Sequence, residues 1–204
     1  MTYDSNILAL NPKHFWKMDE TSGTVCTDYG STPVNGVYNG GPTLNQAPLT
    51  IPSGPPGSTI SSGPMVLLDG IDDSMTVNTT PGYTALTICM WVKNLTSSDK
   101  YWFTWGWTGG SSLPLCIGGA GDFGNSNNWS VGMFNSSSWS GSLAGSALGG
   151  AGSERFILAT ISSGGLLRLW ENGRFKSQQS VSTFPAYAAG LLLRVGRRWD
   201  GTAH

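Results

Sequence analysis

The sequence predicts an all-β protein made of two antiparallel sheets packed face to face. Short runs of β-branched and aromatic residues alternate with Gly, Asn, Asp or Pro, which is the pattern of strands joined by tight turns. Helical periodicity is nearly absent from the chain. A length of 204 residues suits one β-sandwich, so we expect a single domain over residues 1–204.

The strand pattern occurs in a series of short segments. In chain order they are 13–18, 65–69, 73–77, 85–93, 101–106, 129–134, 155–162, 165–171 and 191–197. The clearest is 85–93, where side chains alternate between two faces. One face would carry Leu86, Ile88, Met90 and Val92, and the other Thr87, Cys89, Trp91 and Lys93. Because both faces include apolar residues, we expect a sandwich strand whose second face is partly covered.

Residues 162–175 predict a hairpin. Ser163-Gly164-Gly165 would turn the chain, 166–171 would form the return strand, and Asn172-Gly173 would make a second tight turn. Asn and Gly both tolerate the positive φ that a type I′ turn requires.

Two stretches predict long loops. Residues 40–64 contain six prolines together with several Gly and Ser residues. Residues 135–153 consist almost wholly of Gly, Ser, Ala and Asn around Trp139. Strand patterns resume directly after each stretch, so neither indicates a domain boundary.

Several of these segments also carry short motifs in a fixed order. They are 15–23 with Asp28 and Asn35-Gly36, then 68–77, 86–92 and 166–173, and finally 193–197 with Asp200-Gly201. In this order they resemble the laminin G-like members of the concanavalin A-like jelly-roll fold. The resemblance implies a jelly-roll sandwich with one more strand after that Asp-Gly, paired beside the first strand. Because the sequence ends at His204, we expect either a truncated chain or a partner that supplies the strand.

The resemblance also has implications for function. Domains of this kind without a signal peptide are similar to those in structural proteins of tailed bacteriophages. That similarity implies a non-catalytic component of a virion, either a decoration protein or a tail protein. Such a protein would dock on the capsid or tail as a homo-oligomer or as a lattice-bound copy. Host glycans would be a further ligand. The alternative is a free carbohydrate-binding lectin or adhesion module.

The composition of the chain excludes some classes of binding partner. Charged residues make up 11% of the chain, against about 25% in average soluble domains. The net charge of -1 and the absence of a clustered basic stripe argue against nucleic acid as a partner. No secretory signal or membrane-spanning apolar run is present, which favours folding in a cytoplasm. Location on a virion assembled in a host cytoplasm is what the resemblance implies. An odd set of cysteines without a CxxC pair predicts buried free thiols at Cys26, Cys89 and Cys116.

The tryptophans are candidates for sugar stacking. Sugars present apolar C–H faces that stack on indoles, while amide side chains bind the hydroxyls. The sequence therefore predicts a ligand site formed by Trp129, Trp139, Asn127, Asn128 and Asn135, with Trp139 the strongest candidate. The alternative for any one tryptophan is core packing, and alternation assigns that role to the set Tyr101, Phe103, Trp105 and Trp107.

Acidic residues are candidates for calcium, although Asp is also a common turn residue. The candidates are Asp19, Asp28, Asp69, Asp72, Asp73 and Asp200, with Asp28 and Asp200 the favoured pair. No cofactor is required by any motif. Catalysis is not expected, because each glutamate stands alone and the two histidines lie near the chain ends, so neither a glycosidase carboxylate pair nor a Ser-His-Asp set is predicted.

Overall fold

The computed structural model describes residues 3–52, 59–61, 63–79, 83–94, 101–106, 115–118, 128–135, 138–147, 153–181 and 191–196. Within these ranges the chain forms one short helix, α1 (Tyr3–Ala9), and is otherwise built from strands. No helix among these residues is long and apolar enough to cross a membrane.

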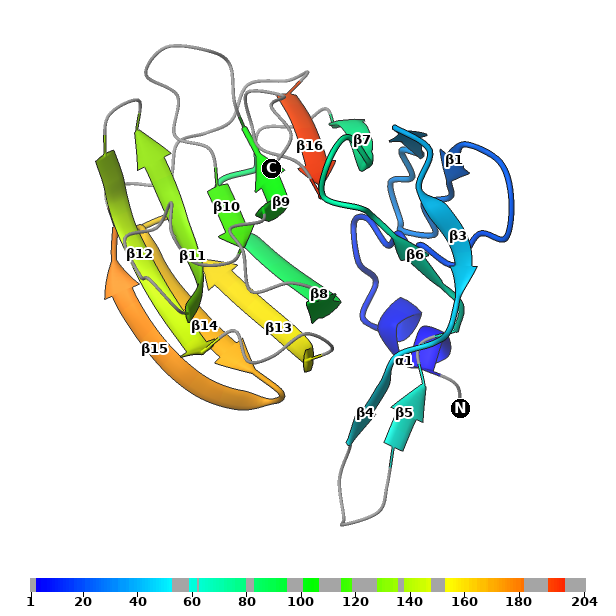
Figure 1. Ribbon diagram of the computed structural model, residues 1–204. Coiled ribbons are helices and arrows are strands. Elements are labelled where there is room, and N and C mark those ends of the chain that lie inside the picture. The colour runs from blue at the N-terminus through cyan, green and yellow to red at the C-terminus, as the bar shows by residue number, and fades with distance from the viewer. Residues whose placement is uncertain are drawn as a thin grey trace.

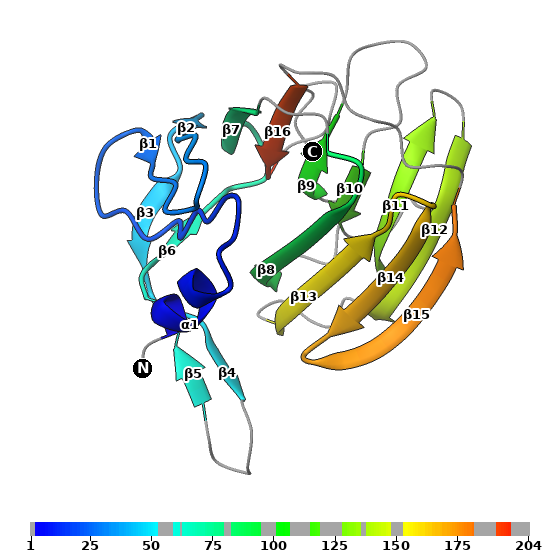
Figure 2. The same ribbon diagram turned by 180° about the vertical axis from the view of Figure 1, so that it is seen from behind.

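Two antiparallel sheets form the two layers of the molecule (Figures 1 and 2). The larger has eight strands in the order β1 (Val25–Cys26), β2 (Gly36–Asn39), β7 (Ser74–Thr79), β16 (Leu191–Val195), β9 (Tyr101–Trp105), β10 (Leu115–Gly118), β11 (Asn128–Asn135) and β12 (Ser138–Ala147). The smaller has four strands in the order β15 (Arg174–Ser180), β14 (Leu166–Glu171), β13 (Ser153–Ile161) and β8 (Leu86–Asn94). This architecture confirms the predicted all-β, two-sheet antiparallel sandwich.

Two small antiparallel pairs lie beside the sandwich together with α1 (Figure 1). They are β3 (Thr43–Gln46) with β6 (Met65–Leu67), and β4 (Thr50–Pro52) with β5 (Thr59–Ser61). β3, β4 and β5 fall inside 40–64, so the prediction of one long loop there is wrong. Of the prolines in this stretch, those among the described residues lie at strand ends or in connections, where they are compatible with strands this short.

The core lies between the two sheets and follows the period-2 alternation of each strand. On β13, burial alternates along the strand, with every second residue from Arg155 to Ile161 buried. The opposing sheet contributes large side chains that are almost fully buried, among them Met75, Val77, Phe103, Trp105, Ile117, Val131 and Met133. Burying one side chain of this size stabilises the fold by roughly 1.5–3 kcal/mol.

The predicted strand 13–18 is largely wrong. Only Trp16 makes a ladder contact, an isolated bridge to Asp28, and Met18 has a positive φ of 53° that ends any extended run. The segment is held instead by hydrogen bonds to the Asp28 carboxylate, which are described below.

The predicted loop 135–153 is also wrong, because it contains β12. A glycine- and serine-rich strand has little intrinsic β-propensity, so tertiary contact decides its structure. Gly145 lies so close to the Trp129 indole that a Cβ at this position would overlap the ring. The short β1, β2 and β10, and the polar edge strand β15, were likewise not predicted.

The cysteines confirm part of the prediction. Cys26 and Cys116 are buried free thiols, whereas Cys89 is exposed. Cys89 is exposed because it belongs to the outward-facing set of β8, opposite the set that packs on the core.

Candidate functional site

Trp129, one of the predicted ligand-binding residues, is fully buried. It shares the inner face of β11 with Val131 and Met133, and its ring lies 6.1 Å from that of Trp102. A ring without solvent exposure cannot stack on a sugar, so the prediction for Trp129 is wrong and core packing is its role.

Of the other predicted ligand residues, Asn128 and Asn135 lie at opposite ends of one strand. Asn128 begins β11 and is half-buried, whereas Asn135 ends the same strand. At about 3.3 Å per residue, these two positions lie roughly 23 Å apart. Trp139 lies on β12 opposite Phe134, at the Asn135 end. The side chains of Asn135 and Trp139, and the whole of Asn127, lie outside the described residues, so their part in a site stays a prediction.

Asp28, one of the two favoured calcium candidates, is already saturated with N–H donors. Its side chain has no solvent exposure, and its carboxylate accepts hydrogen bonds from the backbone N–H groups of Phe15 (2.7 Å), Gly30 (2.8 Å) and Val34 (2.8 Å) and pairs with His14 Nδ1 (2.8 Å). Burial acts to raise the pKa of Asp28, but these hydrogen bonds outweigh it and hold the pKa below its usual value. Donors cannot share these lone pairs with a cation, so the calcium assignment at Asp28 is wrong.

The second favoured candidate, Asp200, lies outside the described residues. Asp19, another candidate, is paired with Lys17 at 2.6 Å.

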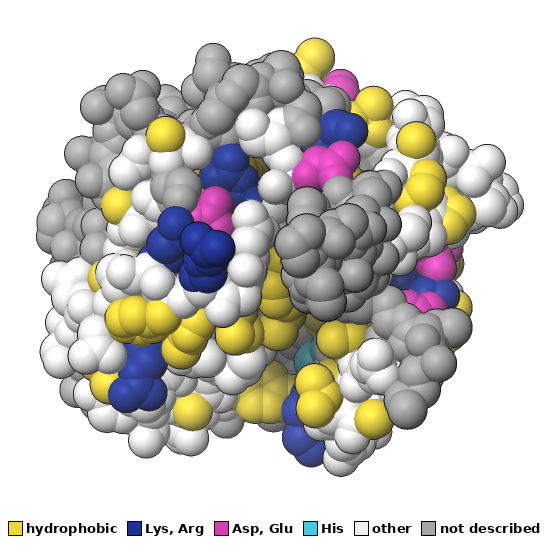
Figure 3. Space-filling model, turned by 90° about the horizontal axis from the view of Figure 1, so that it is seen from below, with side chains coloured by type: hydrophobic (Ala, Val, Ile, Leu, Met, Phe, Trp, Pro, Cys, Tyr) yellow, Lys and Arg dark blue, Asp and Glu magenta, His cyan; other side chains and the backbone are white. Residues whose placement is uncertain are grey.

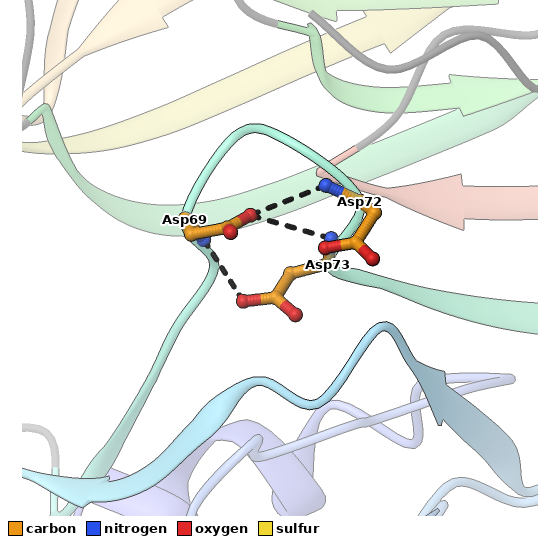
Figure 4. A group of neighbouring side chains, drawn as sticks. All are labelled: Asp69, Asp72 and Asp73. Atoms are coloured by element: carbon orange, nitrogen blue, oxygen red, sulfur yellow. Dashed lines mark hydrogen bonds between the residues drawn. The ribbon is translucent and has the colours of Figure 1, made fainter.

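Asp69, Asp72 and Asp73 do form a cluster, with one carboxylate oxygen from each lying within 4.8 Å of the others (Figure 4). Asp69 Oδ1 accepts a hydrogen bond from the backbone N–H of Ile71 at 2.7 Å, and the Asp69 N–H donates to Asp73 Oδ2 at 3.0 Å. The first of these bonds is that of an Asx turn between β6 and β7, and the second closes the same loop. Turn formation therefore accounts for the arrangement, and nothing further in the cluster indicates a bound cation.

A different surface brings aromatic and polar side chains together. It is the outer face of the four-stranded sheet, the side turned away from the eight-stranded sheet. On β14 the buried residues are Leu167, Leu169 and Glu171, so the alternate residues point outward. Strand register extends this face across β8, β13 and β15.

The centre of the outer face is apolar. Leu158 lies between Cys89 and Trp170 on the neighbouring strands, and we call the set Trp91, Phe156, Leu158, Trp170 and Phe175 the aromatic patch. Its rings form two edge-to-face pairs, Trp91 with Phe156 (6.2 Å) and Trp170 with Phe175 (5.6 Å). Phe175 is 53% exposed and the other four are half-buried. A contiguous apolar surface of this kind marks an interaction site more often than isolated exposed residues do.

A polar row runs beside the aromatic patch across the same strands. Thr160 on β13 lies opposite Thr87 and Arg168, and Arg168 lies opposite Gln178. The Arg168 Nε–H donates a hydrogen bond to Gln178 Oε1 at 3.2 Å. We call Thr87, Thr160, Arg168 and Gln178 the polar row.

A hollow of about 230 Å³ opens at the polar row. Its lining comes from β8 and the residue before it, from β13 and β14, and from the connection between these two strands. It consists of Ala85, Leu86, Thr87, Thr160, Ile161, Ser162, Leu166 and Arg168. Seen from below, hydrophobic side chains form a band across the underside of the molecule, with Lys and Arg side chains on both sides of it (Figure 3).

Charged groups on the outer face are few. Glu154 is paired with Lys93 at 3.0 Å at one end of the face. Glu171 points inward, is buried, and pairs with Arg155 at 3.4 Å and Lys176 at 3.3 Å. In the described part of this face, Glu154 is therefore the one carboxylate, whereas glycoside hydrolysis uses two across a sugar.

Sequence reasoning missed the outer face as a site. The alternation in 154–160 and 166–170 was available, but the lateral neighbours of each side chain depend on the register of four strands. Strand pairing between segments distant in sequence cannot be read from either segment alone.

Comparison with known proteins shows the fold. No protein-family model matches the chain, and no curated protein matches it in sequence. A solved structure concerned with ganglioside-dependent cell entry of botulinum neurotoxin type C is similar over 94% of this chain and 45% of its own, with a TM-score of 0.59 and 12% identity. The binding domain of botulinum neurotoxin serotype D gives a TM-score of 0.57 and 15% identity over 91% of this chain and 44% of its own.

A heptameric pentraxin from Limulus polyphemus is similar over 60% of this chain and 56% of its own, with a TM-score of 0.48 and 18% identity. The chain thus spans less than two thirds of each of these structures. At such low identities the toxin likenesses establish the fold, a concanavalin A-like jelly-roll sandwich, and nothing beyond it.

Proposed function

We propose that this protein is a non-catalytic, lectin-like module that binds glycans on the outer face of its four-stranded sheet. The observation that carries the proposal is the aromatic patch lying directly beside the polar row, on one surface with few charged groups.

This pairing of surfaces matches the chemistry of a sugar ring. Its C–H face is apolar and packs on an aromatic ring such as Trp170 or Phe175. Its hydroxyls need donors and acceptors at the ring edge, which Thr87, Thr160 and Gln178 supply. Binding sites of small ligands commonly combine aromatic walls with a few polar groups in this way.

Glycan recognition by related folds supports the proposal. Cell entry of botulinum neurotoxin type C depends upon interaction with two ganglioside molecules, and the binding domain of neurotoxin DC is described in complex with SialylT. Shared fold does not transfer a ligand site. The proposal therefore rests on the outer face of this chain.

A glycan array with the purified protein tests the proposal, with Trp170→Ala as the site variant. We expect wild type to bind a subset of glycans and Trp170→Ala to lose about fivefold or more in affinity, since one aromatic contact contributes roughly 1 kcal/mol or more. Tyr29→Ala is the matched control, because Tyr29 is an exposed aromatic residue on another part of the surface. An array without binding, or equal losses in both variants, would contradict the proposal.

We also propose, from the sequence resemblance, that the module is carried on a virion. The outer face would then have a second role, because aromatic residues are also typical anchors of protein interfaces. Co-sedimentation of the protein with intact particles from its source tests this location. Recovery of the protein only in the free soluble fraction would favour the alternative, an unattached lectin or adhesion module.

A further inference from the structure

We infer that the hollow beside Arg168 binds the carboxylate of an acidic sugar. This inference rests on the proposed function and names the class of glycan: one that carries a uronic or sialic acid residue. The elements that carry it are the guanidinium, its neighbour Gln178, the hollow and the adjacent Trp170.

Arg168 is the one cation among the residues that line the hollow. Of the other cations of the four-stranded sheet, Lys93 is paired with Glu154, and Lys176 and Arg155 are paired with Glu171, whereas Arg174 lies at the Glu171 position, away from the hollow. Among the residues that the structure describes, no carboxylate lies within ion-pair distance of the Arg168 guanidinium. Its positive charge is therefore available to an anion from outside the chain.

Gln178 orients this guanidinium. The hydrogen bond from Arg168 Nε to Gln178 Oε1 uses one N–H donor of the guanidinium and leaves its two terminal Nη groups for a ligand. Holding one donor in place restricts the side chain before binding, so less conformational freedom is lost when a ligand binds. A planar guanidinium matches a planar carboxylate in a two-bond arrangement.

The hollow has the size and lining for a single sugar ring. Its volume of about 230 Å³ is below the roughly 300–1,000 Å³ typical of drug-sized ligands. Leu166 and Ile161 supply apolar wall, while the hydroxyls of Thr87 and Thr160 can bond to ring hydroxyls. The Ser162 hydroxyl already accepts a hydrogen bond from the Leu166 N–H and helps to fix the wall.

The spacing of Arg168 and Trp170 fits one acidic sugar together with its neighbour. Both residues face outward on β14, two positions apart, which is about 7 Å along a strand. A ring in the hollow with its carboxylate on Arg168 would thus place the next sugar of the chain over the aromatic patch. The two contacts together favour an acidic oligosaccharide over a neutral one.

Titration calorimetry with matched probes tests the inference. The probes are oligosaccharides ending in galacturonic, glucuronic or sialic acid, each compared with its own methyl ester, which removes the charge and keeps the sugar. We expect at least one acid to bind about tenfold or more tightly than its ester, in line with the usual contribution of a charge-assisted hydrogen bond.

Substitutions of Arg168 separate the contribution of its charge to affinity from that of the rest of the binding surface. Arg168→Gln should reduce affinity for the acid to that for the ester and leave ester binding unchanged, and Arg168→Lys should keep part of the preference. Arg174→Gln is the charge-matched control, because Arg174 is exposed at the Glu171 position of the same strand pair, away from the polar row. Arg168 is itself exposed, so its variants should retain the thermal stability of wild type.

Each outcome is decisive. Equal binding of acid and ester, or an equal loss in Arg168→Gln and Arg174→Gln, overturns the inference and leaves the proposed glycan binding intact. A panel on which neither acids nor esters bind also overturns the inference, and a glycan array without binding overturns the proposed function as well.

Discussion

Trp170 on β14 and Phe175 on β15 pack edge to face across the β14–β15 hairpin, with ring centroids 5.6 Å apart and an interplanar angle of 68°. The turn between them, Asn172-Gly173, has positive φ at both residues, 50° and 76°. This confirms the type I′ turn predicted from the Asn-Gly pair. The turn fixes the register of the hairpin, and the register brings the two rings of the aromatic patch together.

Replacing Gly173 therefore tests how the turn supports the site. A Cβ at Gly173 meets nothing within 4 Å, so Gly173→Ala changes backbone strain alone. We expect a loss of about 1 kcal/mol, the cost of a left-handed conformation for an L-residue, and a melting temperature lower by about 2–4 °C. Gly164→Ala is the control, because Gly164 has no positive φ and ample space. Equal effects of both changes in thermal unfolding would disprove the role of the turn.

Asp28 makes a second prediction, about acid stability. Asp28→Asn removes a buried acceptor of four hydrogen bonds and should destabilise the protein by roughly 3 kcal/mol at pH 7. Because the folded-state pKa of Asp28 lies below its ordinary value of 3.8, its contribution is present above that value and is lost as the pH falls further.

Urea unfolding of wild type and Asp28→Asn over a pH series measures this effect. The difference between the two proteins should be constant near neutral pH and shrink below about pH 4. Glu154→Gln, which changes an exposed surface pair, should show no comparable difference. A difference between wild type and Asp28→Asn that is independent of pH would contradict the assigned role of the charge.

The local features of this fold could be predicted and the long-range ones could not. The alternation of 85–93 is confirmed, since Leu86, Ile88, Met90 and Val92 pack against the core. The hairpin turn at Asn172-Gly173 is confirmed too. Both features could be predicted because the residues that determine them are adjacent in sequence.

The predictions that are wrong concern segments whose structure depends on residues distant in sequence. Strand β12 is stabilised at Gly145 by Trp129, and the segment 13–18 is held by Asp28. Trp129 was a candidate for sugar stacking because its neighbours in sequence are polar, yet the inner face of β11 buries it. The aromatic patch was missed because its members come from four strands whose pairing the sequence does not specify.

Asp73 supports a third prediction, on the acidic turn. Burial holds the pKa of Asp73 above its usual value. The negative charges of Asp69 and Asp72 raise this pKa further, whereas the hydrogen bond from the Asp69 N–H lowers it. A raised pKa means that protonation favours the folded state, so the associated stability is present at low pH and is lost as the pH rises. Asp73→Asn should therefore stabilise the protein at pH 7, by less than about 1 kcal/mol, and should have no effect in acid.

The effect of added calcium on the melting temperature tests the same turn for cation binding. We expect added calcium to leave the melting temperature of wild type unchanged, because Asp69 Oδ1 already accepts a backbone hydrogen bond and the cluster is accounted for as an Asx turn. Magnesium at the same ionic strength is the control for screening. A calcium-specific rise that Asp73→Asn abolishes would assign the cluster to a cation instead.

Cys89 offers a direct reporter of binding on the outer face. Cys89 is exposed next to Leu158 at the centre of the aromatic patch, whereas Cys26 and Cys116 are buried. Burial raises the pKa of the Cys89 thiol as well as that of the Cys26 thiol, the latter to about 12, so accessibility is what distinguishes Cys89. A maleimide reagent should therefore modify one thiol in the folded protein and three after unfolding, as counted by mass spectrometry.

A bound glycan should slow the labelling of Cys89, because it would cover the patch between Trp91 and Trp170. The expected protection equals the bound fraction, so a tenfold excess of ligand over its dissociation constant leaves about a tenth of the original rate. At the same ligand concentration, Trp170→Ala should show weaker protection, in proportion to its lower bound fraction, while its rate in the absence of ligand stays close to that of wild type. Full binding measured by calorimetry with an unchanged labelling rate would place the ligand away from the outer face, and the predicted residues Trp139 and Asn135 would then be the next positions to substitute.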